Sequence, residues 1–229
     1  MAAMHCSSAN GSAHLLAPLA RAVDDACARL RGLLRAAAAV GLQRDQYARY
    51  LSFQHHLTNG VQRHFFAIAA HPALVDRRPL REFLFRFGLE EEPHYRVAAA
   101  DLRALGQELL PPPIEVELWW SYFDRIVPTR PFVRLGATAV LENLGPGTAN
   151  ESQQLLRGAP FLTPATTRFL VIHRHEVLPH GDEVMAAIAA AAPDAAEMAD
   201  LVHGAAVGAK LYLGMMEWAL AAAANARVG

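Results

Sequence analysis

Apolar residues recur every three or four positions along most of the chain, which is the period of a helix with one buried face. In the first such segment, residues 14–40, the apolar positions with this spacing are Leu15, Leu16, Leu19, Val23, Ala26, Leu30, Leu33 and Leu34. Ser12 precedes the segment as a capping residue, and Gly41 follows it as a stop. We therefore predict a long first helix, with residues 1–12 as a flexible N-terminal tail.

The same spacing continues to the end of the chain and predicts further helices. We place the main ones at residues 44–70, 79–105, 116–127, 132–144, 163–187 and 194–224, with a short helix at 150–157. The helix that ends at residue 187 begins at either Thr163 or Thr166. Asn59-Gly60 interrupts the second main helix, and Pro93 predicts a kink or a break in the third. The triplet at residues 111–113 is a stiff connector made of prolines.

These elements predict an all-α fold, a single-domain bundle of about seven helices that spans residues 13–229. Alanine is abundant and runs of strand-favouring residues are short, which agrees with helices. A chain of 229 residues can bury a substantial core.

Composition excludes several classes of partner. The net charge of −1 gives no electrostatic reason to expect nucleic acid or an anionic membrane. No apolar run reaches the roughly 18 residues that cross a bilayer, and the first residues lack the order of a signal peptide. The two cysteines, Cys6 and Cys27, are too few for a disulfide framework. We expect a cytoplasmic protein whose partner is a small molecule.

The most chemically distinctive stretch is residues 169–187, FLVIHRHEVLPHGDEVMAA. On a continuous helix, His173, Glu176 and His180 would share one face. Burying two imidazoles and a carboxylate is costly unless each has a partner, and one metal ion would serve all three. The alternative is a polar helix end with surface histidines, and Pro179 argues against an uninterrupted helix.

A second group of candidate ligands lies in the third helix. Glu91 and His94 form a Glu-x-x-His pair. Helix bundles use this pair to bind two metals, because both side chains can reach a common site. The run Glu90, Glu91 and Glu92 also fits a solvated helix face, and either Glu90 or Glu91 could be the ligand.

Glu142 stands in an apolar helix, between Leu141 and a further leucine at position 144. A carboxylate in such surroundings should be paired, protonated or bound to a metal. The alternatives are a buried salt bridge to Arg134 or Arg130, or exposure near the helix end.

Two histidines and three aromatic residues are candidates for a substrate pocket: His55, His56, Trp119, Trp120 and Tyr122. Core packing is the alternative for the aromatic residues. The sequence has no phosphate-binding glycine loop, no Cys-x-x-Cys zinc pattern and no Gly-x-Ser-x-Gly elbow.

The order of Glu-x-x-His, a lone Glu in an apolar helix and a His-rich helix resembles the heme-oxygenase-like diiron oxidases, or iron-containing redox enzymes, which are relatives of TenA and PqqC. The resemblance covers about residues 45–225. It matches Glu91 (or Glu90) and His94 to the family's first pair, Glu142 to its middle carboxylate, and His173 and His180 to its last two histidines. Where the family has an acidic residue between those histidines, this chain has Val177, and Glu176 precedes it by one place.

The resemblance implies a heme-oxygenase-like fold that binds one or two iron ions and uses O2 to oxidise or cleave a small amine or carboxylic acid. It also implies that Glu142 bridges two metals. The alternatives are a metal-free TenA-like or small-molecule-binding protein, a ferritin-like di-iron protein, and a heme protein with His55 or His56 as ligand. A homodimer through the small residues of the last helix is a further expectation, at Ala205, Ala206, Gly208, Ala209 and Gly214.

Overall fold

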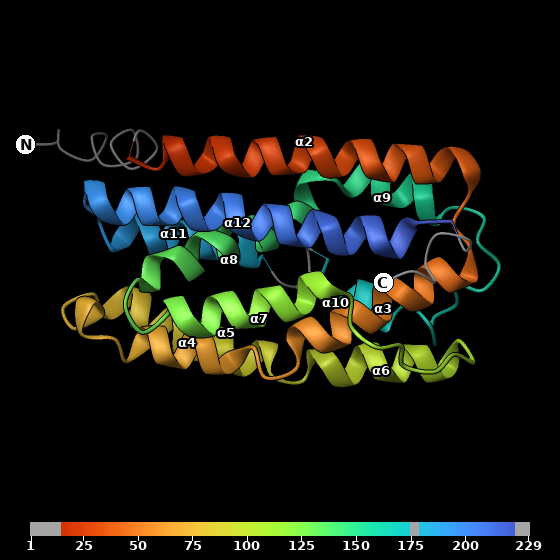
Figure 1. Ribbon diagram of the computed structural model, residues 1–229, viewed down its shortest axis with the longest axis horizontal. Coiled ribbons are helices and arrows are strands. Elements are labelled where there is room, and N and C mark those ends of the chain that lie inside the picture. The colour runs from red at the N-terminus through yellow and green to blue at the C-terminus, as the bar shows by residue number, and fades with distance from the viewer. Residues whose placement is uncertain (1–14, 175–178, 223–229) are drawn as a thin grey trace, which may run out of the picture.

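The computed structural model describes residues 15–174 and 179–222 (Figure 1). These residues form helices and no strand, which confirms the predicted all-α class. The elements are α2 (Ala17–Val40), α3 (Arg44–Thr58), α4 (Gln62–Ala69), the short 3-10 helix η1 (Pro72–Leu74), α5 (Arg78–Glu91), α6 (His94–Ala104), α7 (Ile114–Ile126), α8 (Pro131–Gly147), α9 (Ala149–Leu156), α10 (Arg168–Ile172), α11 (His180–Ala190) and α12 (Ala195–Leu220).

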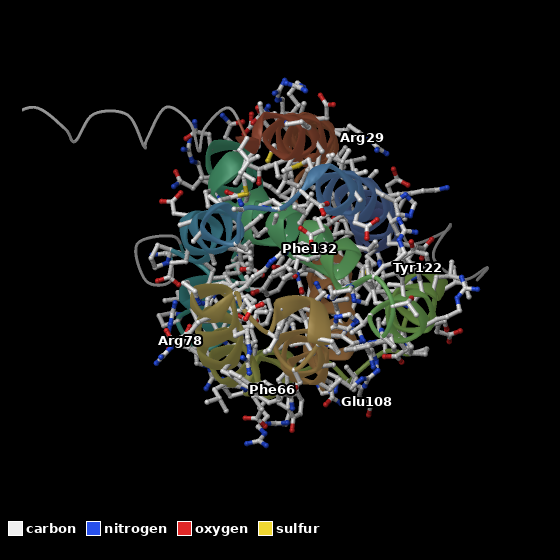
Figure 2. The ribbon with its side chains drawn as sticks, turned by 90° about the vertical axis from the view of Figure 1, so that its left-hand side faces the viewer. Arg29, Phe66, Arg78, Glu108, Tyr122 and Phe132 are labelled. Carbon is white, nitrogen blue, oxygen red and sulfur yellow. The ribbon has the colours of Figure 1, made fainter. Side chains whose placement is uncertain are left out.

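The helices are stacked in layers. α2 lies along one face and packs on α8, α9 and α12, while α3 to α7 form the opposite side (Figure 1). α8 and α12 run through the middle and pack closely against each other. Seen along the bundle, Phe132 of α8 lies at the centre, and Arg29, Arg78 and Glu108 lie at the rim (Figure 2). No described helix has the length and apolar character needed to cross a membrane.

Glycines bring α8 and α12 into backbone contact. A Cβ atom at Gly204 would lie 1.7 Å from the carbonyl oxygen of Val133, and one at Gly136 would lie 1.9 Å from that of Leu201. Gly208 is also buried, against Ala137. Gly208, one of the small residues expected at a dimer interface, therefore packs inside the chain. The homodimer stays a prediction.

Two of the predicted helices are divided where the sequence indicated. The segment 44–70 ends its first part at Thr58, and Gly60 adopts a positive φ of 87° before α4 begins. The segment 79–105 is divided between Glu91 and His94, with Pro93 as the residue that precedes α6. Glu91 and His94 thus lie at the facing ends of two helices.

The prediction that His173 and His180 share one helix face is wrong. α10 ends at Ile172, and α11 begins at His180 with Pro179 before it. Pro179 contributes to the separation, because a proline has no backbone N–H and cannot continue a helix from the four residues before it, so it stands directly before a new helix. Glu176, the third member of the predicted face, lies outside the described residues, as does Val177.

Candidate metal centre

Five of the six predicted ligands gather in one cluster, although they come from five helices or helix ends. Their potential ligand atoms form two groups, each with all its atoms within 4.8 Å of one another. The first group is Glu91, His94 and His173, and the second is Glu91, Glu142 and His180. Glu91 belongs to both groups. The carboxylate that both groups share is thus Glu91, whereas Glu142 belongs to the second group alone, and the expectation that Glu142 bridges two metals stays untested.

The first group is built around the break between α5 and α6. His94 Nδ1 lies 2.8 Å from Glu91 Oε2, and the His173 ring contacts the His94 ring with centroids 4.6 Å apart. His173 Nδ1 lies 2.7 Å from the carbonyl oxygen of Phe169. A carbonyl accepts only, so Nδ1 carries the proton and donates it. This leaves His173 Nε2 with a free lone pair, the form that a metal ligand requires.

The second group is built around His180. Its Nδ1 lies 3.2 Å from Glu91 Oε1 and 3.6 Å from Glu142 Oε2. Its other ring nitrogen, Nε2, lies 3.1 Å from Glu90 Oε2. Metal-binding histidines commonly have such an outer carboxylate, which fixes the ring and its tautomer.

The structure separates the roles of Glu90 and Glu91. Glu91 is only 5% exposed and lies in both groups. The Glu90 side chain is 33% exposed, and it contacts Arg86 as well as the outer nitrogen of His180. Of the two, Glu91 is the candidate ligand and Glu90 orients His180.

Charges in the cluster depend on one another. Burial acts to raise the pKa of Glu91, but the neighbouring imidazoles of His180 and His94 outweigh it and lower this pKa to about 2. Burial acts to lower the pKa of His180, but Glu142 and Glu91 outweigh it and raise this pKa to about 10. Burial and the charge of Glu91 raise the pKa of Glu142, and burial lowers that of His173. The buried carboxylates therefore need positive charge nearby, which a proton on His180 or a bound metal can supply at the cluster itself.

The residues of the cluster fit a divalent metal. Glu91 Oε1 is buried and has no hydrogen-bond partner among the described residues, although His180 Nδ1 lies 3.2 Å from it. Two imidazoles and a carboxylate, as in the first group, are a donor set typical of non-heme iron(II). Glu142 does not form the alternative salt bridge to Arg134 or Arg130, since Arg130 pairs with Asp200 and Arg134 bonds to uncharged side chains; the ionic neighbour of Glu142 is His180.

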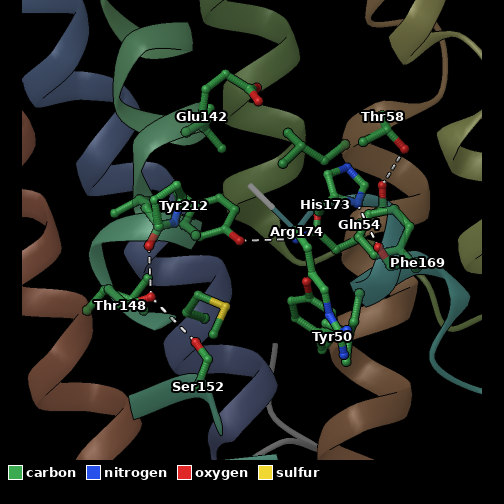
Figure 3. Close-up of a pocket in the computed structure, with 18 of the residues that line it drawn as sticks. Tyr50, Gln54, Thr58, Glu142, Thr148, Ser152, Phe169, His173, Arg174 and Tyr212 are labelled. Carbon is green, nitrogen blue, oxygen red and sulfur yellow. Dashed lines mark hydrogen bonds between the residues drawn. The ribbon is translucent and has the colours of Figure 1, made fainter. Parts of the chain in front are cut away.

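A cavity of about 1110 Å³ opens beside the cluster. Glu91, Glu142, His173 and His180 are part of its wall. Figure 3 shows Glu142 at one end and Thr148 and Ser152 at the other, with Tyr212 between them. Most of the remaining wall is apolar or aromatic, and it includes Tyr47, Tyr50, Phe65, Trp119, Phe169 and Met216. The volume is slightly above the range found for sites that enclose a small molecule, roughly 300–1,000 Å³.

Of the five residues predicted to line a substrate pocket, only Trp119 lines this cavity. The other four lie elsewhere because their polar atoms contact other groups. His55 Nδ1 contacts the Tyr95 carbonyl, and His56 Nε2 that of Leu110. Trp120 Nε1 donates to the His56 carbonyl, and the Tyr122 hydroxyl contacts His203 Nε2.

The sequence reasoning missed the polar face of α3 that lines the cavity. Tyr50, Gln54 and Thr58 follow one another at four-residue steps, so they lie on one side of the helix. Gln54 and Thr58 are buried, and Gln54 Nε2 donates to the Tyr212 hydroxyl over 3.1 Å (Figure 3). A stripe of polar residues in a helix that is otherwise buried was the available signal.

No protein-family model and no curated protein matches the chain. A solved structure does match: the crystal structure of a domain of unknown function with a heme oxygenase-like fold from Shewanella denitrificans OS217. The two share 18% sequence identity and a TM-score of 0.69, over 88% of each chain. At this identity the likeness shows the fold alone. The chain therefore has a heme oxygenase-like fold, as expected, and its chemistry must be argued from its own residues.

Proposed function

We propose that the chain is an iron-dependent oxidase or oxygenase that uses O2 to oxidise a small organic molecule held in the cavity. The observation that carries the proposal is the position of Glu91, which is shared by two groups of ligands in the cavity wall. Glu91, His94 and His173 would hold one iron, and Glu91, Glu142 and His180 a second. Bound iron would supply the capacity to bind O2 and reduce it.

The chain's own residues would do the rest of the work. The Phe169 carbonyl holds His173 in the tautomer with a free Nε2, and Glu90 holds the ring of His180. The aromatic wall, including Tyr50 and Phe169, would exclude water and hold the substrate's apolar part beside the cluster. Loading the second group would displace the proton of His180, because an imidazole binds a metal only when the coordinating nitrogen is deprotonated.

Anaerobic titration of the metal-free protein with Fe(II), followed by O2 and visible spectroscopy, tests the proposal. We expect uptake of about two ions per chain and a new absorption band after O2 is added. Glu91→Ala should lose both ions, since it removes a ligand from each group, whereas Glu142→Ala should keep one. Glu92→Ala is the matched control, because Glu92 is partly exposed and pairs with Arg96 outside the two groups. Full uptake by Glu91→Ala would refute the proposed centre.

A second candidate function is a metal-free protein that binds a small molecule. The observation in its favour is that His180 Nδ1 lies 3.2 Å from Glu91 Oε1 and 3.6 Å from Glu142 Oε2. These carboxylates raise the pKa of His180 to about 10, so a proton on His180 can balance their charge without a metal. TenA-like cysteine chemistry is not favoured, because Cys27 does not line the cavity and burial raises the pKa of its thiol. A protein that takes up no Fe(II) but binds a ligand in the cavity would support this second function.

A further inference from the structure

Arg134 is a buried cation in the cavity wall that has no carboxylate partner among the described residues. Only 2% of it is exposed, and it lines the same cavity as the candidate metal centre. Its hydrogen bonds go to neutral groups: Nη1 donates to Thr138 Oγ1 over 2.6 Å, and Nε to His64 Nδ1 over 3.4 Å. Buried charges in proteins are normally paired, so a lone one facing a cavity indicates an anionic ligand.

Aromatic rings hold the guanidinium group in place. Its central carbon lies 5.0 Å from the ring centre of Trp119, 5.1 Å from that of Phe65 and 5.3 Å from that of Phe123. Such contacts are favourable for a cation and restrict the planar group to one orientation. The two hydrogen bonds engage two of its five N–H groups, which leaves three for a ligand.

His64 orients Arg134 without neutralising it. Burial, together with the charge of Arg134, lowers the pKa of His64 to about 4, so the imidazole is neutral at pH 7. Its Nε2 lies 2.7 Å from Asp124 Oδ1, which accepts the ring proton. Nδ1 is then an acceptor for the Nε–H group of Arg134. This fixes the Nε side of the guanidinium toward His64 and leaves the remaining N–H groups available.

Arg134 lies on the same side of α8 as Glu142, a candidate metal ligand, and both line the cavity. Arg134, Thr138 and Glu142 follow at four-residue steps on α8, so they form one stripe along the cavity. Eight residues correspond to about 12 Å along a helix axis. Burial lowers the pKa of Arg134 to about 10, against the opposing effect of Glu142 and Glu91, so the group is charged at neutral pH.

We propose that Arg134 anchors the carboxylate group of the substrate, and that the substrate is a small carboxylic acid with an apolar, aromatic or aliphatic body. A guanidinium edge with free N–H groups matches the two oxygens of a carboxylate. The apolar body would extend along the cavity toward Glu142. The assignment of the ligand as a substrate depends on the proposed function, but its binding does not require iron.

The test is calorimetric binding of three matched probes to the metal-free protein: 4-phenylbutyrate, 4-phenylbutanol and 4-phenylbutylamine. We expect the carboxylate to bind at least about ten times more tightly than the alcohol, as a hydrogen bond to a charged group allows. Arg134→Gln should abolish this preference and leave binding of the alcohol almost unchanged, while Arg134→Lys should keep part of it. Arg174→Gln is the control, because Arg174 also lines the cavity but is exposed.

The probes separate the proposal from a purely structural role. If Arg134 only balanced the charges of Glu91 and Glu142, Arg134→Gln would weaken all three probes alike, or leave the preference intact, and either result would overturn the proposal. Wild-type protein that binds no carboxylate, or that loses its preference in Arg174→Gln instead, would also overturn it. Should Arg134→Gln fail to fold by circular dichroism, Thr138→Val tests the same point, because it removes the acceptor that positions Nη1. A carboxylate preference without Fe(II) uptake would uphold the anchor and refute the oxidase.

Discussion

Replacing Gly204 by alanine tests whether the contact between α8 and α12 positions the candidate site. A Cβ at this position would lie 1.7 Å from the carbonyl oxygen of Val133 and 2.5 Å from its carbonyl carbon, whereas real contacts essentially never fall below 3.0 Å. The obstacle is backbone, which cannot rotate aside as a side chain does. The two helices would have to separate by more than an ångström.

The magnitude follows from two opposing effects. Alanine is favoured over glycine inside a helix by about 1 kcal/mol. Overpacking of a buried contact costs about 1–3 kcal/mol, and a clash with backbone belongs at the upper end of that range. We therefore expect Gly204→Ala to lower the free energy of unfolding by about 2 kcal/mol or more. We also expect weaker Fe(II) binding, because α8 carries Glu142.

Urea unfolding followed by circular dichroism measures the change, and Gly214→Ala is the matched control in the same helix. A Cβ at Gly214 would meet the side chain of Glu115 at 2.8 Å, and that flexible side chain can move. Gly214→Ala should therefore unfold at the same urea concentration as the wild type, or at a higher one. If Gly204→Ala proved as stable as Gly214→Ala, the close contact between α8 and α12 would be refuted.

Three further predictions follow from the charges of the site. Fe(II) affinity should rise with pH between 6 and 9, because the metal competes with a proton on His180, whose pKa is about 10. Calorimetry in two buffers of different ionisation enthalpy measures the protons released on binding, and an affinity that did not change with pH would contradict the prediction. The fold lowers the pKa of His64 from 6.5 to about 4, so it favours the neutral imidazole. The free energy of unfolding should therefore be highest above pH 6.5 and fall by about 3 kcal/mol as the pH is lowered to 4. Urea unfolding of His64→Gln should show a shallower pH dependence between pH 6.5 and 4 and no difference in slope above pH 6.5. Asp101→Asn should lower the free energy of unfolding by about 2 kcal/mol and weaken Fe(II) binding. The reason is that buried Asp101 accepts a hydrogen bond from the backbone N–H of Phe169 over 2.8 Å and so fixes the helix that leads to His173. An unchanged midpoint of urea unfolding would contradict this prediction.

Much of the fold could be predicted from the sequence because its signals are local. The spacing of apolar residues gives helices of the right order, and Asn59-Gly60 and Pro93 mark two real breaks. The choice between Glu90 and Glu91 could not be made in this way. Neighbouring residues on a helix point about 100° apart, and three consecutive glutamates each offer a carboxylate. Only the packing of α5 against α11 and α4 decides that Glu91 faces inward.

The cavity depends even more on tertiary structure. Trp119 and Trp120 are adjacent in sequence, yet Trp119 lines the cavity and Trp120 donates to a backbone carbonyl outside it. From the sequence, Arg134 is only a candidate salt-bridge partner for Glu142, because the pattern shows that the two residues share a helix face but not that a cavity lies beside them. Composition and spacing cannot reveal a space between helices.

The break between α10 and α11 explains how two histidines seven residues apart serve two groups of ligands. On a continuous helix they would be separated by about 10.5 Å along one stripe. In the structure, α10 packs on α6 and brings His173 to His94, whereas α11 packs on α5 and α8 and brings His180 to Glu91 and Glu142. Gly181 permits the second approach, because a Cβ there would lie 2.9 Å from the Glu142 carbonyl oxygen. Pro179 thus stands directly before the helix that carries His180, where the chain passes from one candidate metal position to the other.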